Sequence, residues 1–388
     1  LQGTGLHVAD VTQVNDNEVR ANVGQSVNSA AYGGGVYSQR SVLTHNLVVS
    51  NTLQGRNDAY GGGIYSTGPY TLTNNNVVSN TARTSEVTNA RAHGGGIYSD
   101  RTLVENNEVR ANLAEGPGGL GGGVFVTDGS IRFNTIVDNQ ADGNAGAVQW
   151  LSGSGDLTYN TVQDNRTSGN TGGIYVVAGF PIIHHNTLLA PGIILYDSNP
   201  AGSPRLDARY NWWGIADRTL LQAVIYDFYD DPSLGFVNYV PYLSDEPSRS
   251  PTAGTVNGRS NGVTGTAYQF EVNIYPIAAR LPITFVWQTT DHGVITRKVD
   301  ALQDTASFTW ETPGEKQIRV TAANAEGSVT IIYTTTVAGI FASDAYEADN
   351  ACQQAGVIGT DGTAQYRTFH TVQDEDWATF AATAGATY

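Results

Sequence analysis

Hydrophobic and polar residues alternate in short segments along the first two thirds of the chain. The segments 63–66 (Gly-Ile-Tyr-Ser), 70–72 (Tyr-Thr-Leu) and 76–78 (Asn-Val-Val) are typical. β-Branched residues are frequent in them, and no apolar period of 3.6 residues is sustained, so the pattern predicts strands rather than helices. Polar turns rich in Gly and Asn separate the segments. The region is therefore expected to consist of many short strands.

Two phrases recur at a fixed spacing within this pattern. A Gly-Gly-Gly-apolar-aromatic phrase occupies 33–37, 61–65, 94–98 and 121–125, with degenerate copies at 145–149 and 171–175. A second phrase, Asn-x-apolar-x-x-Asn, begins at Asn17, Asn46, Asn75, Asn107, Asn134 and Asn160, and its first asparagine alone recurs at Asn186 and Asn211. Successive first asparagines are 25 to 32 residues apart. Short strands at such a period predict a parallel solenoid of about eight coils.

Stacking of the coils explains why the phrases recur. Neighbouring coils lie about 4.8 Å apart, so each residue stands over its own copy. The first asparagines are then expected to form a hydrogen-bonded ladder, and glycine allows the close approach of backbone or an aromatic ring. An aromatic column is expected from Tyr37, Tyr65, Tyr98, Phe125 and Tyr175. We expect this column to fill the core; an outward column could stack on sugar rings.

The repeated phrases resemble those of right-handed parallel β-helix proteins. They are similar to the pectate-lyase-like superfamily, and especially to polymorphic-outer-membrane-type surface proteins and adhesins. The resemblance covers residues 1–243, where the segment 210–214 (Tyr-Asn-Trp-Trp-Gly) is similar to the usual end of such a helix. Trp212 and Trp213 are expected to cover the apolar end of the stack.

Composition changes after residue 243. Residues 244–254 are rich in Pro, Ser and Asp and are interpreted as a linker. Strand-like runs at 268–272, 283–287, 306–310, 316–320 and 329–333 predict a small β-sandwich over residues 255–338. This region resembles PKD-type immunoglobulin-like domains, with Trp287 as the core tryptophan, although the usual Trp-Asp-Phe-Gly-Asp-Gly phrase is absent. The predicted fold class is thus all-β.

Residues 339–388 are strongly acidic, with seven acidic residues and one basic residue. The segments 344–350 and 374–380 resemble the start of a pre-peptidase C-terminal domain, which implies a partial β-sandwich. Asp344, Asp349, Asp374 and Asp376, with Glu347 beside them, offer the hard oxygen ligands that calcium prefers. The alternative is a solvated acidic surface. Cys352 is the one cysteine, either a buried thiol or the partner of a cysteine outside this sequence.

The negative net charge of the chain argues against two classes of binding partner. The 388 residues carry a net charge of −16, with only two lysines, Lys298 and Lys316. Such a chain is a poor ligand for nucleic acid or an anionic membrane. No run of 18 apolar residues predicts a membrane span. High Gly, Asn, Thr and Ser with few lysines is typical of secreted bacterial surface proteins, so an extracellular location is expected.

The sequence predicts no catalytic site. A β-helix lyase would need a Lys or Arg base, but the solenoid has no lysine and its arginines are expected in loops and turns. Asp227, Asp230 and Asp231 cluster only after the predicted helix end. His184 and His185 should point to opposite faces of a strand and serve packing or a turn. His93 is expected to be solvated in a loop.

Two functions are compatible with these patterns. The first is a secreted bacterial surface protein of structural or adhesive type, whose partners are further copies of itself or other surface proteins. The second is a carbohydrate-binding or polysaccharide-degrading β-helix protein with a groove formed by its loops. The uncapped first coil and the incomplete last domain are compatible with a head-to-tail filament or with a fragment of a longer chain. No cofactor is expected besides the calcium considered above.

Overall fold

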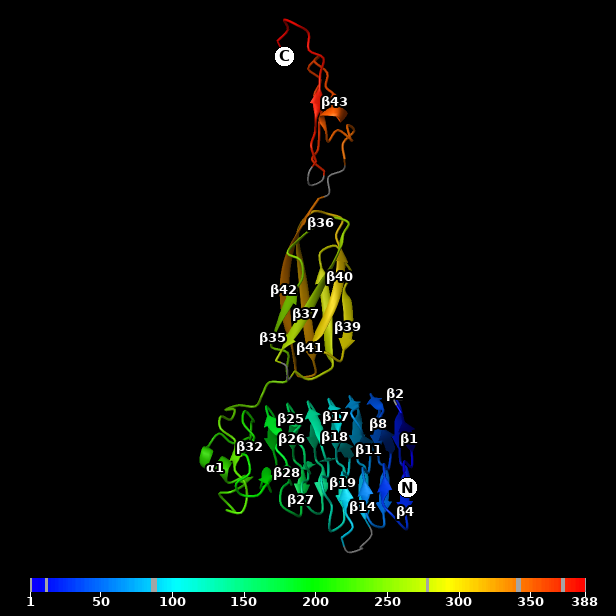
Figure 1. Ribbon diagram of the computed structural model, residues 1–388, viewed down its shortest axis with the longest axis vertical. Helices are drawn as coiled ribbons and strands as arrows, with labels where there is room; N and C mark the ends of the chain where they lie inside the picture. The colour runs from blue at the N-terminus through cyan, green and yellow to red at the C-terminus, as the bar shows by residue number, and fades with distance from the viewer. Residues whose placement is uncertain are drawn as a thin grey trace. The chain divides into compact units, whose positions relative to one another are not determined.

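A computed structural model describes residues 2–10, 13–84, 89–276, 279–339, 343–370 and 374–387. The chain divides into two compact units, Leu1–Ser248 and Arg249–Tyr388. The first unit is a parallel β-solenoid of about eight turns, which confirms the predicted architecture. Figure 1 shows its successive coils side by side, from β1 at the blue end to α1 at the green end.

Five parallel sheets run along the solenoid because each coil contributes short strands that pair with the same strands of its neighbours. The nine-stranded sheet contains β1 (Leu6–Ala9), β6 (Val36–Gln39), β11 (Ile64–Thr67), β16 (Ile97–Asp100), β20 (Val124–Val126), β24 (Val148–Trp150), β28 (Ile174–Val176), β31 (Leu195–Asp197) and β33 (Ile225–Tyr226). A three-stranded sheet beside it contains β5 (Ala31–Tyr32), β10 (Ala59–Tyr60) and β15 (Ala92–His93).

Three further sheets complete the coils. The first contains β2 (Gln13–Asn15), β7 (Val42–Thr44), β12 (Thr71–Thr73), β17 (Thr102–Glu105), β21 (Gly129–Arg132), β25 (Asp156–Thr158) and β29 (Ile182–His184). The second contains β3 (Glu18–Arg20), β8 (Leu47–Val49), β13 (Asn76–Val78), β18 (Glu108–Arg110), β22 (Thr135–Val137), β26 (Thr161–Gln163) and β30 (Thr187–Leu189). The third contains β4 (Val23–Ser26), β9 (Thr52–Gly55), β14 (Thr81–Thr84), β19 (Leu113–Glu115), β23 (Gln140–Ala141) and β27 (Arg166–Thr167).

The register places like residues over like residues. Ile64 pairs with Val36 on one side and Ile97 on the other, and all three are buried. Such columns of Val, Ile and Leu form one core along the solenoid. A second, smaller core is built almost entirely of alanine and lies between the three-stranded sheet and the β4-to-β27 sheet. Burial of each Val, Leu or Ile contributes about 1.5 to 3 kcal/mol.

The glycine triplets combine three different requirements. Gly33 has a φ of 64°, in the left-handed region that favours glycine. A Cβ on Gly34 would lie 2.2 Å from the carbonyl oxygen of Gly62 in the next coil, so the backbones could not approach as they do. A Cβ on Gly35 would lie 2.8 Å from Nδ2 of Asn51. The predicted close approach is confirmed, and it is to backbone and asparagine rather than to an aromatic ring.

The last coil of the solenoid departs from the repeat. It contains the helix α1 (Arg218–Gln222) and the two-stranded parallel sheet β32 (Leu206–Asp207) and β34 (Val237–Asn238). The side chain of Asp217 caps α1 by accepting hydrogen bonds from the backbone N of Thr219 and Leu220. Leu221 anchors the helix in the solenoid core. Among the described residues, no helix is long and apolar enough to cross a bilayer.

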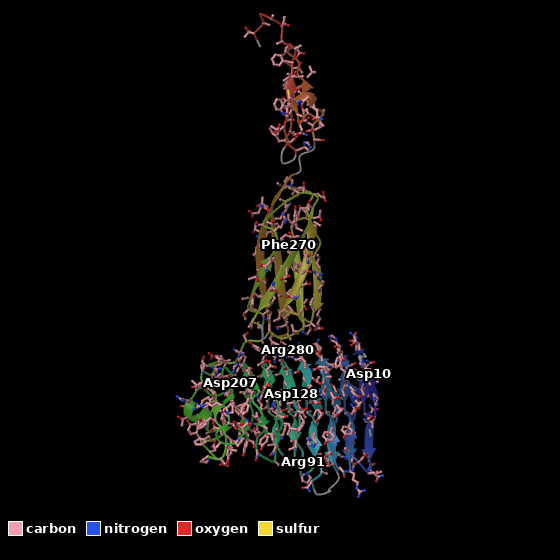
Figure 2. The ribbon with its side chains drawn as sticks, in the orientation of Figure 1. Asp10, Arg91, Asp128, Asp207, Phe270 and Arg280 are labelled. Carbon is pink, nitrogen blue, oxygen red and sulfur yellow. The ribbon has the colours of Figure 1, made fainter. Side chains whose placement is uncertain are left out.

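The second unit contains two antiparallel-dominated sheets over residues 253–338. One contains β35 (Ala253–Asn257), β37 (Ala267–Tyr275) and β40 (Gln303–Thr309); the other contains β36 (Asn261–Val263), β42 (Gly327–Ala338), β41 (Gly314–Asn324), β38 (Ile283–Thr289) and β39 (Ile295–Val299). Four of the five predicted runs lie wholly in strands, the run 306–310 extends one residue beyond β40, and Trp287 is fully buried. Phe270 lies inside this sandwich (Figure 2). Strand β35 begins at Ala253, within the predicted linker.

The acidic C-terminal segment contains little regular structure in its described residues. It has the short 3₁₀ helix η1 (Cys352–Gln354) and a parallel pair, β43 (Gly356–Val357) and β44 (Ala378–Thr379). Cys352 is exposed, so the buried-thiol alternative is wrong.

Candidate functional sites

The first asparagines form a continuous ladder along the solenoid. Nδ2 of Asn46 donates to Oδ1 of Asn75 at 3.0 Å, and the backbone N of Asn46 donates to the same oxygen at 2.9 Å. Nδ2 of Asn46 also donates to the carbonyl of Val14 in the preceding coil at 2.7 Å. The same contacts link Asn17, Asn46, Asn75, Asn107, Asn134, Asn160, Asn186 and Asn211 in sequence. Each buried amide thereby satisfies its donors and its acceptor.

A second ladder runs through the asparagines that end each phrase. Its members are Asn22, Asn51, Asn80, Asn112, Asn139 and Asn165. A Cβ on the last glycine of each Gly triplet would lie about 3 Å from the Nδ2 of this ladder, as Gly63 would from Asn80 at 3.0 Å. The two repeated phrases therefore recur together because the glycine leaves the space that the asparagine needs.

Left-handed turns place the asparagines. His45 and Asn74, for example, precede Asn46 and Asn75 with φ of 56° each. From the fifth coil on, the residues in this turn position are aromatic and stack at 5.0 to 5.5 Å: Phe133, Tyr159, His185 and Tyr210. This column was missed because its residues stand just outside the strands. Its sequence signal is an aromatic ring immediately before each of the last four first asparagines.

The predicted aromatic column is present in two pieces. Tyr37, Tyr65, Tyr98 and Phe125 stack at 5.0 to 5.5 Å with interplanar angles of 9° to 14°. Gln149 then occupies the register position between Phe125 and Tyr175. Tyr175 continues to two rings that sequence reasoning missed, Tyr196 at 4.8 Å and Tyr226 a further 4.5 Å away. His7 extends the other end, 4.6 Å from Tyr37.

The column lies on the outer face of the nine-stranded sheet, which corrects the expectation that it fills the core. Along β6, Val36 belongs to the core cluster, whereas Tyr37 does not. Successive side chains of a strand point to opposite faces. The inward positions are taken by Val36 and Ser38, so Tyr37 must face outward.

A second aromatic column explains why the outward tyrosines are still largely covered. Tyr32, Tyr60 and His93 stack at 5.0 and 4.7 Å. Their edges meet the first column, as between Tyr60 and Tyr98 at 5.2 Å and 83°. Burial raises the pKa of Tyr98 to about 12. The two columns form an interlocked aromatic layer rather than an open platform for sugars.

His93 is part of this layer, which corrects the expectation that it is solvated. Its side chain is 9% exposed, and it meets Phe125 edge-on at 4.7 Å. Burial lowers the pKa of His93 to about 4, against a smaller opposing effect of Asp58. The signal that could have placed it is the residue before each Gly triplet, where Tyr32, Tyr60 and His93 are equivalent.

His184 and His185 have separate packing roles. His184 ends β29 and its Nε2 lies 2.9 Å from Oδ1 of Asp207. His185 lies in the left-handed turn, not in the strand, and stacks between Tyr159 and Tyr210. The packing role was predicted, but the assumed placement of both residues in one strand was wrong.

The two tryptophans at the end of the repeat differ in placement. Trp213 is 1% exposed and belongs to the solenoid core together with Leu221 of α1. Trp212 is half-buried, and its backbone continues the coil stacking by donating to Asn186 O at 2.8 Å and accepting from Leu188 N at 2.7 Å. Trp213 thus fills the end of the core, whereas Trp212 contributes mainly through its backbone.

Acidic residues after the repeat stabilise turns. Asp227 is fully buried and accepts hydrogen bonds from the backbone N of Tyr229 and Val237 at 3.0 Å each. Asp231 accepts from the N and the hydroxyl of Ser233 at 2.9 and 2.7 Å. Arg83 lies within β14, not in a loop as expected, and Arg101 pairs with Asp100 at 3.2 Å.

The C-terminal segment brings together most of the predicted metal ligands. Asp344, Glu347 and Asp376 each offer a carboxylate oxygen, and these oxygens lie within 4.8 Å of one another. Asp374 is adjacent, with Glu347 and His370, in a second group of the same size. Asp349 is in neither group and forms an ion pair with Arg367.

The geometry of this cluster fits a hard cation. The side chain of Asp374 is fully buried, and its Oδ1 and the Oδ1 of Asp376 are shielded from solvent without a hydrogen-bond partner in the described part of the chain. Buried carboxylate oxygens are costly unless a cation or donor satisfies them. Nδ1 of His370 lies 2.8 Å from Oδ2 of Asp374, so one oxygen of that carboxylate is already occupied.

No family model and no curated protein matches the chain. Among solved structures, the chain is similar to the PKD domain of an M14-like peptidase from Thermoplasmatales archaeon SCGC AB-540-F20. The identity is 19%, the TM-score is 0.21, and the match covers 23% of this chain and 96% of that domain.

Proposed function

We propose that the chain is a secreted surface protein of structural or adhesive type, whose solenoid serves as a stiff rod. The observation that carries the proposal is the unbroken asparagine ladder from Asn17 to Asn211. The polar side chains inside the coils bind neighbouring coils instead of converging on a pocket. Eight coils at about 4.8 Å give about 38 Å of rod.

We also propose that the solenoid belongs to the pectate-lyase-like superfamily and that the C-terminal segment belongs to the pre-peptidase C-terminal family. The alternative of a polysaccharide-degrading enzyme is less well supported, because Asp227 and Asp231 are held by backbone groups. A test incubates the full chain with acidic and neutral polysaccharides and measures the release of reducing ends. We expect none; steady release that is lost on substitution of an acidic residue would contradict a purely structural role.

Location and self-association can be tested directly. Antibodies against the chain should label intact cells of the source organism, and labelling only after lysis would contradict a surface location. Head-to-tail assembly into a filament remains a prediction. Light scattering on the full chain should give particles much larger than one chain; a monomer at every concentration would contradict it.

We also propose that Asp344, Glu347 and Asp376 bind calcium, with Asp374 beside them. Calcium takes carboxylate oxygens in flexible geometry, which suits the oxygens of this cluster. Titration of the full chain with CaCl₂ should raise the unfolding temperature of the C-terminal segment. Asp376→Asn should abolish that rise, whereas Asp361→Asn, a change at an exposed aspartate of the same segment, should not. A rise that survives Asp376→Asn would contradict this ligand set.

A further inference from the structure

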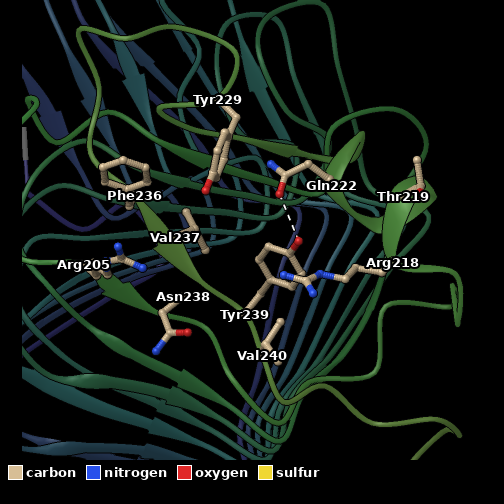
Figure 3. Close-up of a pocket in the computed structure, with 10 residues that line it drawn as sticks. All are labelled: Arg205, Arg218, Thr219, Gln222, Tyr229, Phe236, Val237, Asn238, Tyr239 and Val240. Carbon is tan, nitrogen blue, oxygen red and sulfur yellow. Dashed lines mark hydrogen bonds between the residues drawn. The ribbon is translucent and has the colours of Figure 1, made fainter.

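The last coil of the solenoid contains a pocket of about 460 Å³, a size common for small-molecule sites. Figure 3 shows the side chains that line it. They are Arg205, Arg218, Thr219, Gln222, Tyr229, Phe236, Val237, Asn238, Tyr239 and Val240. The pocket lies where the repeat ends, in the coil that contains α1 and β34.

The walls of the pocket are held by the fold. Val237 and Asn238 form β34, which pairs with β32 directly after Arg205. On the other side, the Tyr239 hydroxyl donates to Oε1 of Gln222 in α1 at 3.0 Å (Figure 3). Tyr239 is 7% exposed and Val237 is 5% exposed, so they form a fixed apolar floor.

Two guanidinium groups enter the pocket from opposite sides. Figure 3 shows Arg218 reaching from α1 toward Tyr239, and Arg205 reaching in beside Phe236. In the part of the chain that the structure describes, neither forms an ion pair with a carboxylate. Six other arginines of the solenoid form ion pairs with carboxylates: Arg20, Arg40, Arg101, Arg110, Arg132 and Arg209. The Arg218 side chain hydrogen-bonds to Tyr239, so its charge is held in place without being neutralised.

The buried carboxylate of Asp227 does not line the pocket. It accepts hydrogen bonds from the backbone N of Tyr229 and Val237, and from Nε2 of the lining residue Gln222 at 3.4 Å. The pocket therefore presents positive charge to a ligand.

Aromatic rings line one wall. The guanidinium carbon of Arg205 lies 4.9 Å from the centre of the Phe236 ring, a cation–π arrangement that orients the arginine. Tyr229 meets Phe236 edge-on at 5.6 Å and is itself 70% exposed. An exposed tyrosine face beside a fixed aromatic wall is suited to the apolar face of a sugar ring.

We propose that this pocket binds a hexuronate unit of an acidic glycan. A guanidinium can bind the planar carboxylate through two parallel hydrogen bonds. The ring face would lie on Tyr229, and the side-chain amide of Asn238 can bind a hydroxyl. Inorganic phosphate would leave the aromatic wall unused. The inference rests on the adhesive part of the proposed function, for which it names the ligand class.

The test uses the full chain and a defined probe. The probe is a tetrasaccharide of alternating glucuronate and N-acetylglucosamine, compared with the same molecule after reduction of its carboxyl groups to alcohols. Calorimetric titration should show that the acidic form binds 10- to 100-fold more tightly, on the order expected for a hydrogen bond to a charged group.

Three variants separate the contributions. Arg205→Gln and Arg218→Gln should each weaken the acidic probe by about 10-fold or more and leave the reduced probe unchanged. Tyr229→Ala should weaken both probes alike, because stacking does not depend on the carboxylate. Arg110→Gln is the control, since it removes the same charge from an ion pair on β18. All four side chains are well exposed, so unfolding temperatures should not change.

Each contrary outcome overturns the inference. Equal affinity for the two probes excludes carboxylate recognition, and binding of neither probe excludes a glycan site of this class. Phosphate that binds in the pocket while neither sugar does identifies a simple anion site. None of these results bears on the structural role of the rod, which depends on the ladder and not on this pocket.

Discussion

The solenoid and the β-sandwich bury their apolar residues in different ways. The solenoid uses strands of two to four residues, and its core is columns of Val, Ile and Leu repeated from coil to coil. The sandwich uses strands of up to 12 residues around one aromatic core of Phe270, Phe285, Trp287, Phe308 and Trp310. In the solenoid, the asparagine ladders specify the register between coils. In the sandwich, long antiparallel strand pairs specify the register. The stability of the solenoid is therefore distributed over many similar contacts, whereas that of the sandwich depends on a few large side chains in one core.

The largest expected loss of stability comes from a substitution in the aromatic core of the sandwich. Phe285 is fully buried in the sandwich, so Phe285→Ala should destabilise this unit by about 3 to 5 kcal/mol through the cavity that it leaves. Calorimetry of the full chain should show a lower sandwich transition and an unchanged solenoid transition. The control Ile332→Ala changes a side chain that is 56% exposed and should have little effect. Equal shifts of both transitions would show that the two units are not independent.

The next effect is at the centre of the ladder. Asn107 accepts from Asn75 at 3.0 Å and donates to Asn134 at 3.0 Å, so Asn107→Ala leaves several buried groups without partners. We expect a loss of about 3 kcal/mol in the free energy of unfolding of the solenoid, measured in urea. Asn17→Ala removes the same side chain at the exposed end of the ladder and should cost less than about 0.5 kcal/mol. If Asn107→Ala and Asn17→Ala lowered the free energy of unfolding by similar amounts, burial would not determine what each ladder asparagine contributes.

The third prediction concerns the pH dependence of the stability of the solenoid, to which His93 in the aromatic layer should contribute. The pKa of His93 is lowered to about 4, so the folded state favours the neutral ring. Its stabilising contribution is present above about pH 6.5, the ordinary value, and is lost as the pH falls toward 4. The expected loss between pH 7 and pH 4.5 is about 2 to 3 kcal/mol. His93→Phe keeps the stack and should remove this share of the pH dependence in urea unfolding; an unchanged dependence would exclude His93 as its source.

The smallest effect concerns the first aromatic column. Tyr65 stacks on both Tyr37 and Tyr98, whereas Tyr175 has one ring neighbour in the column because Gln149 interrupts it. Tyr65→Leu should cost about 1 kcal/mol and Tyr175→Leu about half as much. Thermal unfolding of the two variants measures the difference. A larger loss at Tyr175 would indicate that stacking is not what the column contributes.

Sequence reasoning succeeded wherever the repeat is strict. The asparagine ladder and the stacking of like residues follow from spacing alone, because a residue that recurs once per coil must lie over its own copy. The direction of the aromatic column was not predicted correctly. Because side chains alternate along a strand, the Tyr37 side chain must lie on the opposite face from those of Val36 and Ser38. The sequence does not say which of the two faces is buried.

The amino-acid sequence by itself determined the all-β class, the period of the solenoid, the two kinds of ladder residue and the change of architecture after the repeat. Only the tertiary structure decided which strand face is buried, that His93 joins a second aromatic column, and that Arg205 and Arg218 share a pocket. The physical reason is that periodic contacts link equivalent positions, which can be counted along the chain. The last coil has no period, so the contacts there join residues whose proximity depends on how α1 and β34 pack.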